Sequence, residues 1–206
     1  MADEQPQPDW PFYYRILNGW DFLTVRDVAE WLNIPRRKVQ IYVELGLIRS
    51  RTSAPGTGNA RKFSLTDLTL FALFNRLDGL GIAPRFLRSI SSEVNEIFRG
   101  PVSEPGDRPL YLVIEPNTGG SMVVRSVRVE QLSEALSSPG AIFVNAATLE
   151  SDTLLRFAER MPASSEAQTL LATLRRAISL TDGIRDRTHI KIHALLSRVG
   201  RARNLN

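Results

Sequence analysis

The chain has no cysteine among its 206 residues. This absence excludes disulfide bonds, thiolate metal sites and thiol-based redox sensing, and it fits a reducing compartment. No apolar run approaches the roughly 20 residues that a membrane-spanning helix requires. The first residues, Met1 to Asp9, include Asp3 and Glu4 and lack the basic cap and apolar run of a secretory signal. We therefore expect a soluble protein of the cytoplasm that has no membrane partner.

Histidine is also scarce, since the chain contains only His189 and His193. They lie one helical turn apart, a spacing at which two imidazoles can bind one zinc ion. No third ligand accompanies them, so we favour an exposed or capping pair over a metal site. The run Gly119 to Ser121 lacks the lysine of a phosphate loop and the trailing glycine of a nucleophile turn. No carboxylate pair has an obvious acid–base arrangement. We predict no catalytic residue, no metal and no cofactor, and hence no enzyme.

Positive charge is concentrated locally, although the net charge is only +4. Within residues 36–62, Glu44 alone opposes a group of basic residues: Arg36, Arg37, Lys38, Arg49, Arg51, Arg61 and Lys62. A second basic group lies in 185–203, where it either touches DNA outside the main site or keeps the terminus solvated. A charge run by itself is usually a solvated surface, so the scaffold beneath it decides its meaning.

A capping box starts the first of two predicted helices. The Thr24 hydroxyl can accept the backbone N–H of Asp27, whose carboxylate can reach back to Thr24. Apolar residues then recur at helical spacing and predict an inward face: Val25, Val28, Ala29 and Leu32. The run 33–35, Asn-Ile-Pro, ends this helix, because proline disfavours helical geometry in the preceding residue and suits the start of a new helix.

The second helix is predicted from about Pro35 to Gly46, which ends it. Its inward stripe consists of Val39, Tyr42 and Val43, and its other side carries Arg36, Arg37, Gln40 and Glu44. Two such helices joined by a tight turn form a helix-turn-helix, whose second helix normally enters the major groove of DNA.

A basic hairpin is predicted next. The extended segments 49–52 and 60–63 flank residues 53–59, which are dense in turn formers. We interpret this hairpin as a wing with basic residues on both legs. A second capping box, Ser64 to Asp67, then opens a helix.

Two packing helices complete the predicted unit. The first ends at Gly79 and Gly81, and the second runs from Ala83-Pro84 to about Phe98. Their apolar residues can fill the space beneath the helix-turn-helix.

In this order the pieces resemble the DNA-binding domain of the MerR family of transcriptional regulators. The resemblance rests on 23–29 (LTVRDVA), 44–48 (ELGLI), 61–64 (RKFS) with Asp67-Leu68, and 77–82 (LDGLGI). The chain departs from the family at 39–43, which reads VQIYV where members usually have LRYYE, and at Ala60, which replaces the usual wing tyrosine. These departures leave the preferred DNA sequence undetermined.

The resemblance implies contacts with phosphates or bases from Arg36, Arg37 and Lys38, with Tyr42 near the DNA backbone. It also implies that the wing residues Arg61 and Lys62 grip flanking phosphates. If Gln40 faces the groove, its amide can pair with adenine, and an arginine can pair with guanine. We predict a DNA-binding surface made of Thr24, Arg26, Arg36, Arg37, Lys38, Gln40, Tyr42, Arg49, Arg51, Arg61 and Lys62.

Four segments are predicted along the chain. Residues 1–21 form an N-terminal arm whose aromatic side chains pack on the next domain, or alternatively stack on bases. Residues 22–99 form the winged helix-turn-helix, and 100–109, rich in proline and glycine, form a linker. Residues 110–206 form a smaller α+β domain that ends in helices. Helices predominate in both domains, and the predicted fold class is therefore mainly α.

The second half is predicted to combine a hairpin, a third strand and helices. The strands are 110–115, 122–129 and 141–144, with a short helix at about 130–136. Helices at 149–159, 165–180 and 184–199 carry apolar stripes. These stripes either belong to the domain core or form an intersubunit helix pair, and we do not recognise a family for this half.

These features predict a sequence-specific transcription regulator. The resemblance implies a cytoplasmic, nucleoid-associated homodimer that distorts promoter DNA and alters the access of RNA polymerase, with the second half as a dimerisation domain or sensor of an unknown effector. The alternative is an architectural or recombination accessory factor resembling a phage excisionase, without signal sensing. A winged helix used only for protein contacts is a further alternative, which the joint basicity of the wing and the helix start disfavours. The extra folded half favours the regulator.

Overall fold

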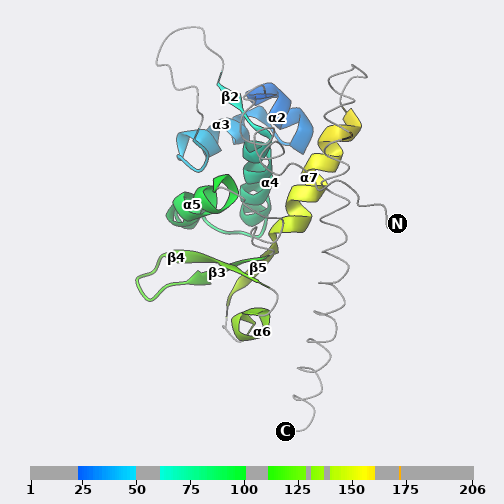
Figure 1. Ribbon diagram of the computed structural model, residues 1–206. Helices are drawn as coiled ribbons and strands as arrows, with labels where there is room; N and C mark the ends of the chain where they lie inside the picture. The colour runs from blue at the N-terminus through cyan, green and yellow to red at the C-terminus, as the bar shows by residue number, and fades with distance from the viewer. Residues whose placement is uncertain are drawn as a thin grey trace, which may run out of the picture.

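Figure 1 shows the computed structural model of the chain, which describes residues 23–49, 61–100, 111–128, 131–136, 140–160 and 172. The predicted N-terminal arm, most of the wing and of the linker, and the last two predicted helices apart from residue 172 lie outside these residues. Helices make up most of the described part, and two small sheets accompany them, so the fold is mixed α+β with helices predominating. No helix in the described ranges is long and apolar enough to cross a membrane.

Two short helices, α2 (Val25–Leu32) and α3 (Arg36–Glu44), begin the described chain. Both halves of the Thr24 capping box are present, as predicted. Asn33 ends α2 in the left-handed region at φ 53°, a conformation that asparagine tolerates better than most residues. The next helix follows after Pro35, so the tight turn predicted from the sequence is confirmed.

The segment leaving α3 is anchored in the core. Gly46 adopts φ +73°, which glycine accommodates without strain and which turns the chain away from the helix axis. Leu47 and Ile48 follow and are 0% and 1% exposed. Burial of one such side chain contributes about 1.5–3 kcal/mol to the free energy of folding. The hydrophobic anchor therefore fixes where the chain departs from α3.

The helices α4 (Leu65–Gly79) and α5 (Pro84–Arg99) pack beneath α2 and α3, as predicted. The second capping box is complete as well, since Ser64 and Asp67 exchange both hydrogen bonds. Most of α4 is buried, so it forms the centre of the core.

A two-stranded sheet joins the start of α2 to the start of α4. The strand β1 (Leu23–Thr24) pairs antiparallel with β2 (Lys62–Phe63). The extended segment at 60–63 was predicted from the sequence, but its partner β1 was not. Thr24 is both the last residue of β1 and the N-cap of α2, because an N-cap residue has extended backbone, here with φ −90° and ψ 169°. Arg49 lies outside any strand, and the rest of the predicted first leg lies outside the described residues.

The second half begins with a three-stranded antiparallel sheet in the order β4-β3-β5. Its strands β3 (Tyr111–Pro116), β4 (Met122–Val127) and β5 (Ile142–Asn145) match the three predicted strands to within two residues. The hairpin between β3 and β4 closes with a hydrogen bond from the Asn117 N–H to the Ser121 carbonyl, 2.8 Å. The glycine-rich run before Ser121 is therefore a turn, as predicted.

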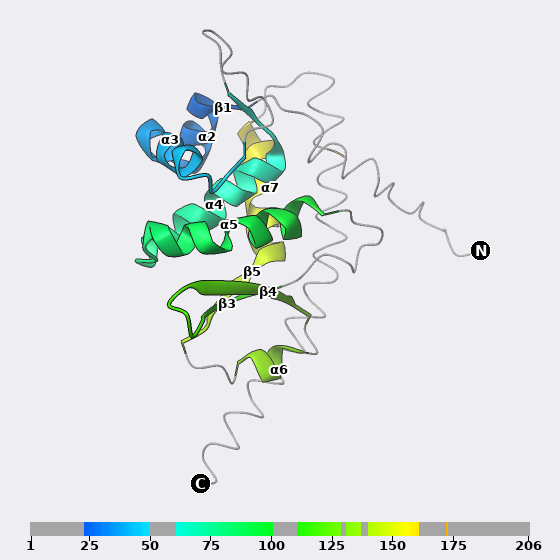
Figure 2. The same ribbon diagram turned by 90° about the vertical axis from the view of Figure 1, so that its left-hand side faces the viewer.

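The two faces of this sheet pack against different helices. Leu112, Ile114 and Val144 join the large core cluster, whereas Val113 and Val127 form a smaller cluster with the short helix α6 (Leu132–Ala135). This division follows the period of two in a strand. Figure 2 shows the sheet between α5 on one side and α6 on the other.

The last described helix, α7 (Ala146–Arg160), runs beside α4. The Asn145 side chain caps it by accepting the Thr148 N–H at 2.9 Å. The Phe157 ring lies 4.8 Å from that of Trp31 in α2. A single core cluster thus takes residues from both sides of the predicted linker. The described parts of the two halves are packed together, and their division into separate domains stays a prediction.

Candidate nucleic-acid interface

The helix α3 has one buried and one exposed face. Val39 and Tyr42 are 0% and 3% exposed, whereas the other side is solvent-exposed and carries Arg36, Arg37, Gln40 and Glu44. The predicted amphipathic pattern is therefore confirmed. The core fixes the orientation of α3, and its polar face remains accessible to a partner.

Carboxylates from α2 and α3 accompany the exposed arginines. Glu30 Oε1 lies 2.7 Å from Nε of Arg26 and 3.9 Å from Nη2 of Arg36. Glu44 Oε1 lies 3.0 Å from Nη1 of Arg37. All five side chains are more than half exposed, and such pairs contribute little to stability. A phosphate can therefore replace the carboxylate beside an arginine at small cost.

Lys38 and Tyr42 turn toward the end of α4 instead of the exposed face of α3. Lys38 Nζ lies 2.8 Å from Oδ2 of Asp78, and the Tyr42 hydroxyl donates to the same oxygen at 3.1 Å. Burial, together with the Asp78 carboxylate, raises the pKa of the Tyr42 hydroxyl above its ordinary value. The structure places Tyr42 in the core and Lys38, about one third exposed, at its edge.

The remaining predicted site residues lie around β1 and β2. Thr24 is half-buried and occupied by its capping box, while Arg49, Arg61 and Lys62 are exposed. Lys62 stands directly opposite Thr24 in the strand pair. The elements α2, α3 and β2 gather at one end of the molecule (Figure 1). The described basic residues of the predicted surface thus belong to, or directly adjoin in the sequence, elements that share one end of the molecule. Arg51 lies outside the described residues.

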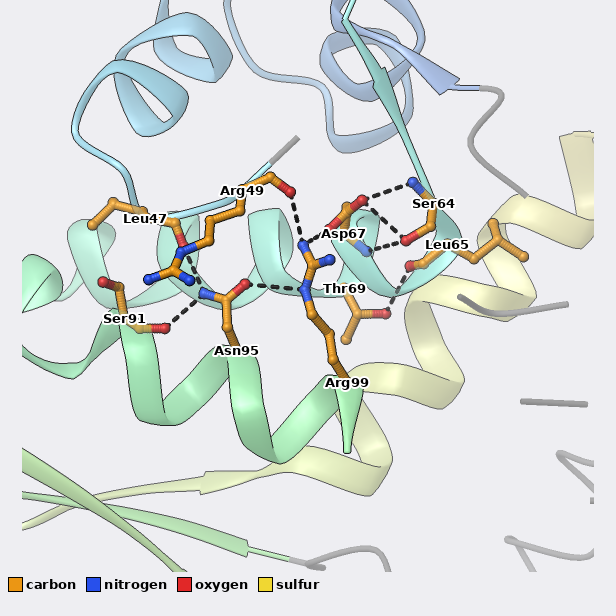
Figure 3. A network of polar contacts seen from close by, with 9 residues as sticks. All are labelled: Leu47, Arg49, Ser64, Leu65, Asp67, Thr69, Ser91, Asn95 and Arg99. Carbon is orange, nitrogen blue, oxygen red and sulfur yellow. Dashed lines mark hydrogen bonds and ion pairs between the residues drawn. The ribbon is translucent and has the colours of Figure 1, made fainter. Parts of the chain in front are cut away.

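A buried polar network holds both ends of the segment 50–60. Asp67 accepts hydrogen bonds from the backbone N–H and the hydroxyl of Ser64, at 2.8 and 3.0 Å, and forms an ion pair with Arg99 at the end of α5 (Figure 3). Its side chain is 1% exposed and that of Arg99 is 19% exposed. The residue that follows β2 is therefore fixed to α5.

The other end of the same segment is held by the same helix. The Arg99 Nη2 donates to the Arg49 carbonyl at 3.0 Å, and the Asn95 Nδ2 donates to the Leu47 carbonyl at 2.8 Å. Asn95 also accepts from Arg99 Nε at 3.2 Å (Figure 3). The backbone of Arg49 is thus held directly by α5. Arg61 lies three residues before Ser64, which the same network holds through Asp67.

The residues that hold the basic side chains and the segment 50–60 in place were not predicted from the sequence. Asp67 was predicted only as a cap, and Glu30, Asp78, Asn95 and Arg99 were not singled out. A signal existed for part of the network, since Ser91, Asn95 and Arg99 recur every four residues on the otherwise apolar packing side of α5. A polar stripe at helical spacing within a buried face indicates a buried network.

A comparison with models of protein families finds no match. A comparison with curated proteins finds no relative of this chain.

No group of three or more metal-ligating side chains lies together in the described ranges. His189 and His193 lie outside them.

Proposed function

We propose that this protein is a DNA-binding transcription regulator of the MerR type, in which α3 enters the major groove of duplex DNA. The exposed face of α3 carries the proposal, because Arg36, Arg37 and Gln40 project from a helix whose opposite face packs on the core through Val39 and Tyr42. Arginines neutralise phosphates and release counterions, and glutamine can pair with the edge of adenine.

The segment between α3 and α4 is the proposed wing. Its described ends carry Arg49, Arg61 and Lys62, all exposed, and the strand β2, which contains Lys62, lies at the same end of the molecule as α3 (Figure 1). The network of Asp67, Asn95 and Arg99 supports this role because it holds both ends of the segment at fixed places relative to α3. Such an arrangement suits simultaneous contact with the groove and with the flanking phosphates.

The proposed interface is narrower than the set predicted from sequence. It consists of Arg26, Arg36, Arg37 and Gln40 with the wing residues Arg49, Arg51, Arg61 and Lys62. Tyr42 and Thr24 support the scaffold, and Lys38 lies at its edge. On the resemblance alone we extend the proposal to a homodimer that acts at promoters with RNA polymerase and responds to an effector.

The first test measures binding to duplex DNA against salt. Fluorescence anisotropy with a labelled random-sequence duplex and with genomic fragments should give an affinity that falls steeply between 50 and 200 mM salt, about 0.9 in log–log slope per phosphate contact. The double substitution Arg36→Gln and Arg37→Gln should weaken binding about tenfold or more and flatten that slope. Gln40→Ala should instead change the preference among sequences.

The matched control is Arg128→Gln, which removes an exposed arginine at the end of β4, far from α3. Its binding should equal that of the parent. No salt-dependent affinity for duplex DNA, or equal losses for the α3 and β4 variants, would contradict the proposal. Sites selected from the host genome should lie upstream of genes as two-fold symmetric halves. Sites clustered at a recombination junction would favour the accessory factor instead.

A further inference from the structure

A cavity of ≈ 210 Å³ lies where α2, α4 and α7 meet. Its lining includes Trp31 of α2, Ala72 and Arg76 of α4, and Leu149, Asp152 and Arg156 of α7. The volume corresponds to about seven water molecules at ~30 Å³ each. It is smaller than the roughly 300–1,000 Å³ of sites for drug-sized ligands, so it suits a small metabolite.

The charge of the lining favours an anion. Arg76 and Arg156 lie on α4 and α7 respectively, and both are exposed to solvent at the cavity. Neither guanidinium has a hydrogen bond or an ion pair to another residue in the described part of the chain. Asp152 is the carboxylate among the lining residues, so two positive charges face one negative charge, a balance of +1.

Apolar surface lies beside these charges. Trp31 presents an aromatic ring and Leu149 an aliphatic side chain to the same cavity. Small-molecule sites combine an apolar lining with a few polar groups that fix orientation, and a planar guanidinium matches a carboxylate through two parallel hydrogen bonds. We propose that this cavity binds a small organic anion, a monocarboxylate with an apolar ring or chain, through Arg76 and Arg156.

The location gives such a ligand access to the proposed DNA-binding unit. Trp31 is near the end of α2, directly before the turn to α3, and its ring also contacts Phe157 of α7 at 4.8 Å. A bound anion therefore touches α2, α4 and α7 together. Any effect on DNA affinity rests on the proposed function, whereas binding of the anion itself does not.

Benzoate is the probe for the full chain without DNA, and benzamide is its neutral match in shape. Binding is followed by the indole N–H signal of Trp31 in ¹H–¹⁵N NMR spectra, assigned with Trp31→Phe. We expect benzoate to bind and benzamide to bind at least about tenfold more weakly. Arg76→Gln and Arg156→Gln should each lower the benzoate affinity about tenfold, since hydrogen bonds to charged groups are the strong ones. Arg88→Gln, an exposed arginine of α5 outside the cavity, should leave it unchanged.

Ala72→Met tests the cavity by another route, because it fills space and leaves both arginines in place. It should abolish the benzoate shift of the Trp31 signal while the rest of the spectrum remains that of a folded protein. Equal affinities for benzoate and benzamide, binding that survives in the arginine variants, or no binding at millimolar benzoate would overturn the proposal. Salt-dependent DNA binding is measured on the same samples. If it is present while benzoate does not bind, the anion-binding proposal alone is wrong and the proposed function stands.

Discussion

Arginine meets carboxylate in two contrasting settings. At the end of α5, Arg99 pairs with Asp67, and their side chains are 19% and 1% exposed. On α3, Arg37 pairs with Glu44, and the side chains are 67% and 53% exposed. A buried pair cannot be broken cheaply, because removal of one partner leaves a charge in a poor solvent. An exposed pair exchanges readily with water or with another anion.

The contrast separates structure from function. The Asp67–Arg99 pair also binds backbone atoms of Ser64 and Arg49, so it is occupied in holding the segment between α3 and α4. The exposed arginines make side-chain pairs that a phosphate can replace. Between these extremes lies Asp78, about one third exposed, which holds Lys38 and Tyr42. The energy required to release a basic side chain thus rises from the surface of α3 toward α4 and α5.

The largest expected effect comes from Asp67→Asn. The substitution keeps the shape of the side chain and an acceptor for the cap, but leaves the Arg99 charge without its carboxylate. We expect the free energy of unfolding to fall by about 3 kcal/mol, the lower end for a broken buried pair because Arg99 is partly exposed. Urea denaturation followed by circular dichroism measures this loss.

The control for this prediction is Asp27→Asn, the same substitution at the equivalent position of the other capping box. It should cost about 1 kcal/mol or less, because Asp27 is only half-buried and no ion pair links it to an arginine among the described residues. The double substitution Asp67→Asn with Arg99→Met should be less harmful than the sum of the single ones. Equal losses at the two capping boxes would contradict the contrast between buried and exposed pairs.

These two capping boxes show how far sequence reasoning reaches. Both were predicted, because each depends on residues only three positions apart, and so were the faces of α3. The pairing of β1 with β2 and the ion pair of Asp67 with Arg99 were not, because they join residues far apart in the sequence. Periodicity predicts which side of a helix is buried, but it does not identify the residue on the neighbouring element.

At the candidate site, too, the exposed face of the helix was predictable from the sequence, whereas contacts with residues far along the chain were not. The outward position of Arg36, Arg37 and Gln40 followed from the apolar stripe of α3. The inward position of Tyr42 followed from the same stripe, whereas the position of Lys38 depends on Asp78, which the chain brings back from the end of α4. A count of charges within 36–62 therefore overstated the net positive charge of the surface, because the carboxylates of Glu30 and Asp78 come from outside that window.

A smaller effect is expected from Tyr42→Phe, which removes the hydroxyl that donates to Asp78. At pH 7 the loss should be about 1 kcal/mol, typical of one hydrogen bond. The folded protein raises the pKa of this hydroxyl above the value of about 10 that it has in the unfolded chain. The stabilisation is therefore fully present at pH values below about 10, and it is lost as the pH rises above that value and the unfolded chain loses this proton. The difference between parent and variant should therefore shrink between pH 7 and about 10.5 in urea titrations. A constant difference at both pH values would show that the hydroxyl is not held protonated.

The smallest expected effect concerns an exposed pair and is a gain, whereas the substitutions above cause a loss. Glu30→Gln removes the carboxylate that lies beside Arg26 and Arg36 and thereby removes a negative charge from the proposed phosphate-binding surface. We expect DNA affinity to rise by about two- to fivefold at 50 mM salt, in keeping with the weak energies of exposed pairs, and the gain to fade at higher salt as screening increases. Glu134→Gln removes an exposed carboxylate on α6, at the far end of the molecule, and should leave the affinity unchanged. A loss of affinity in Glu30→Gln would mean that Glu30 orients its arginines for DNA and does not compete with it, because an orienting carboxylate gains importance in the complex whereas a competing one is displaced.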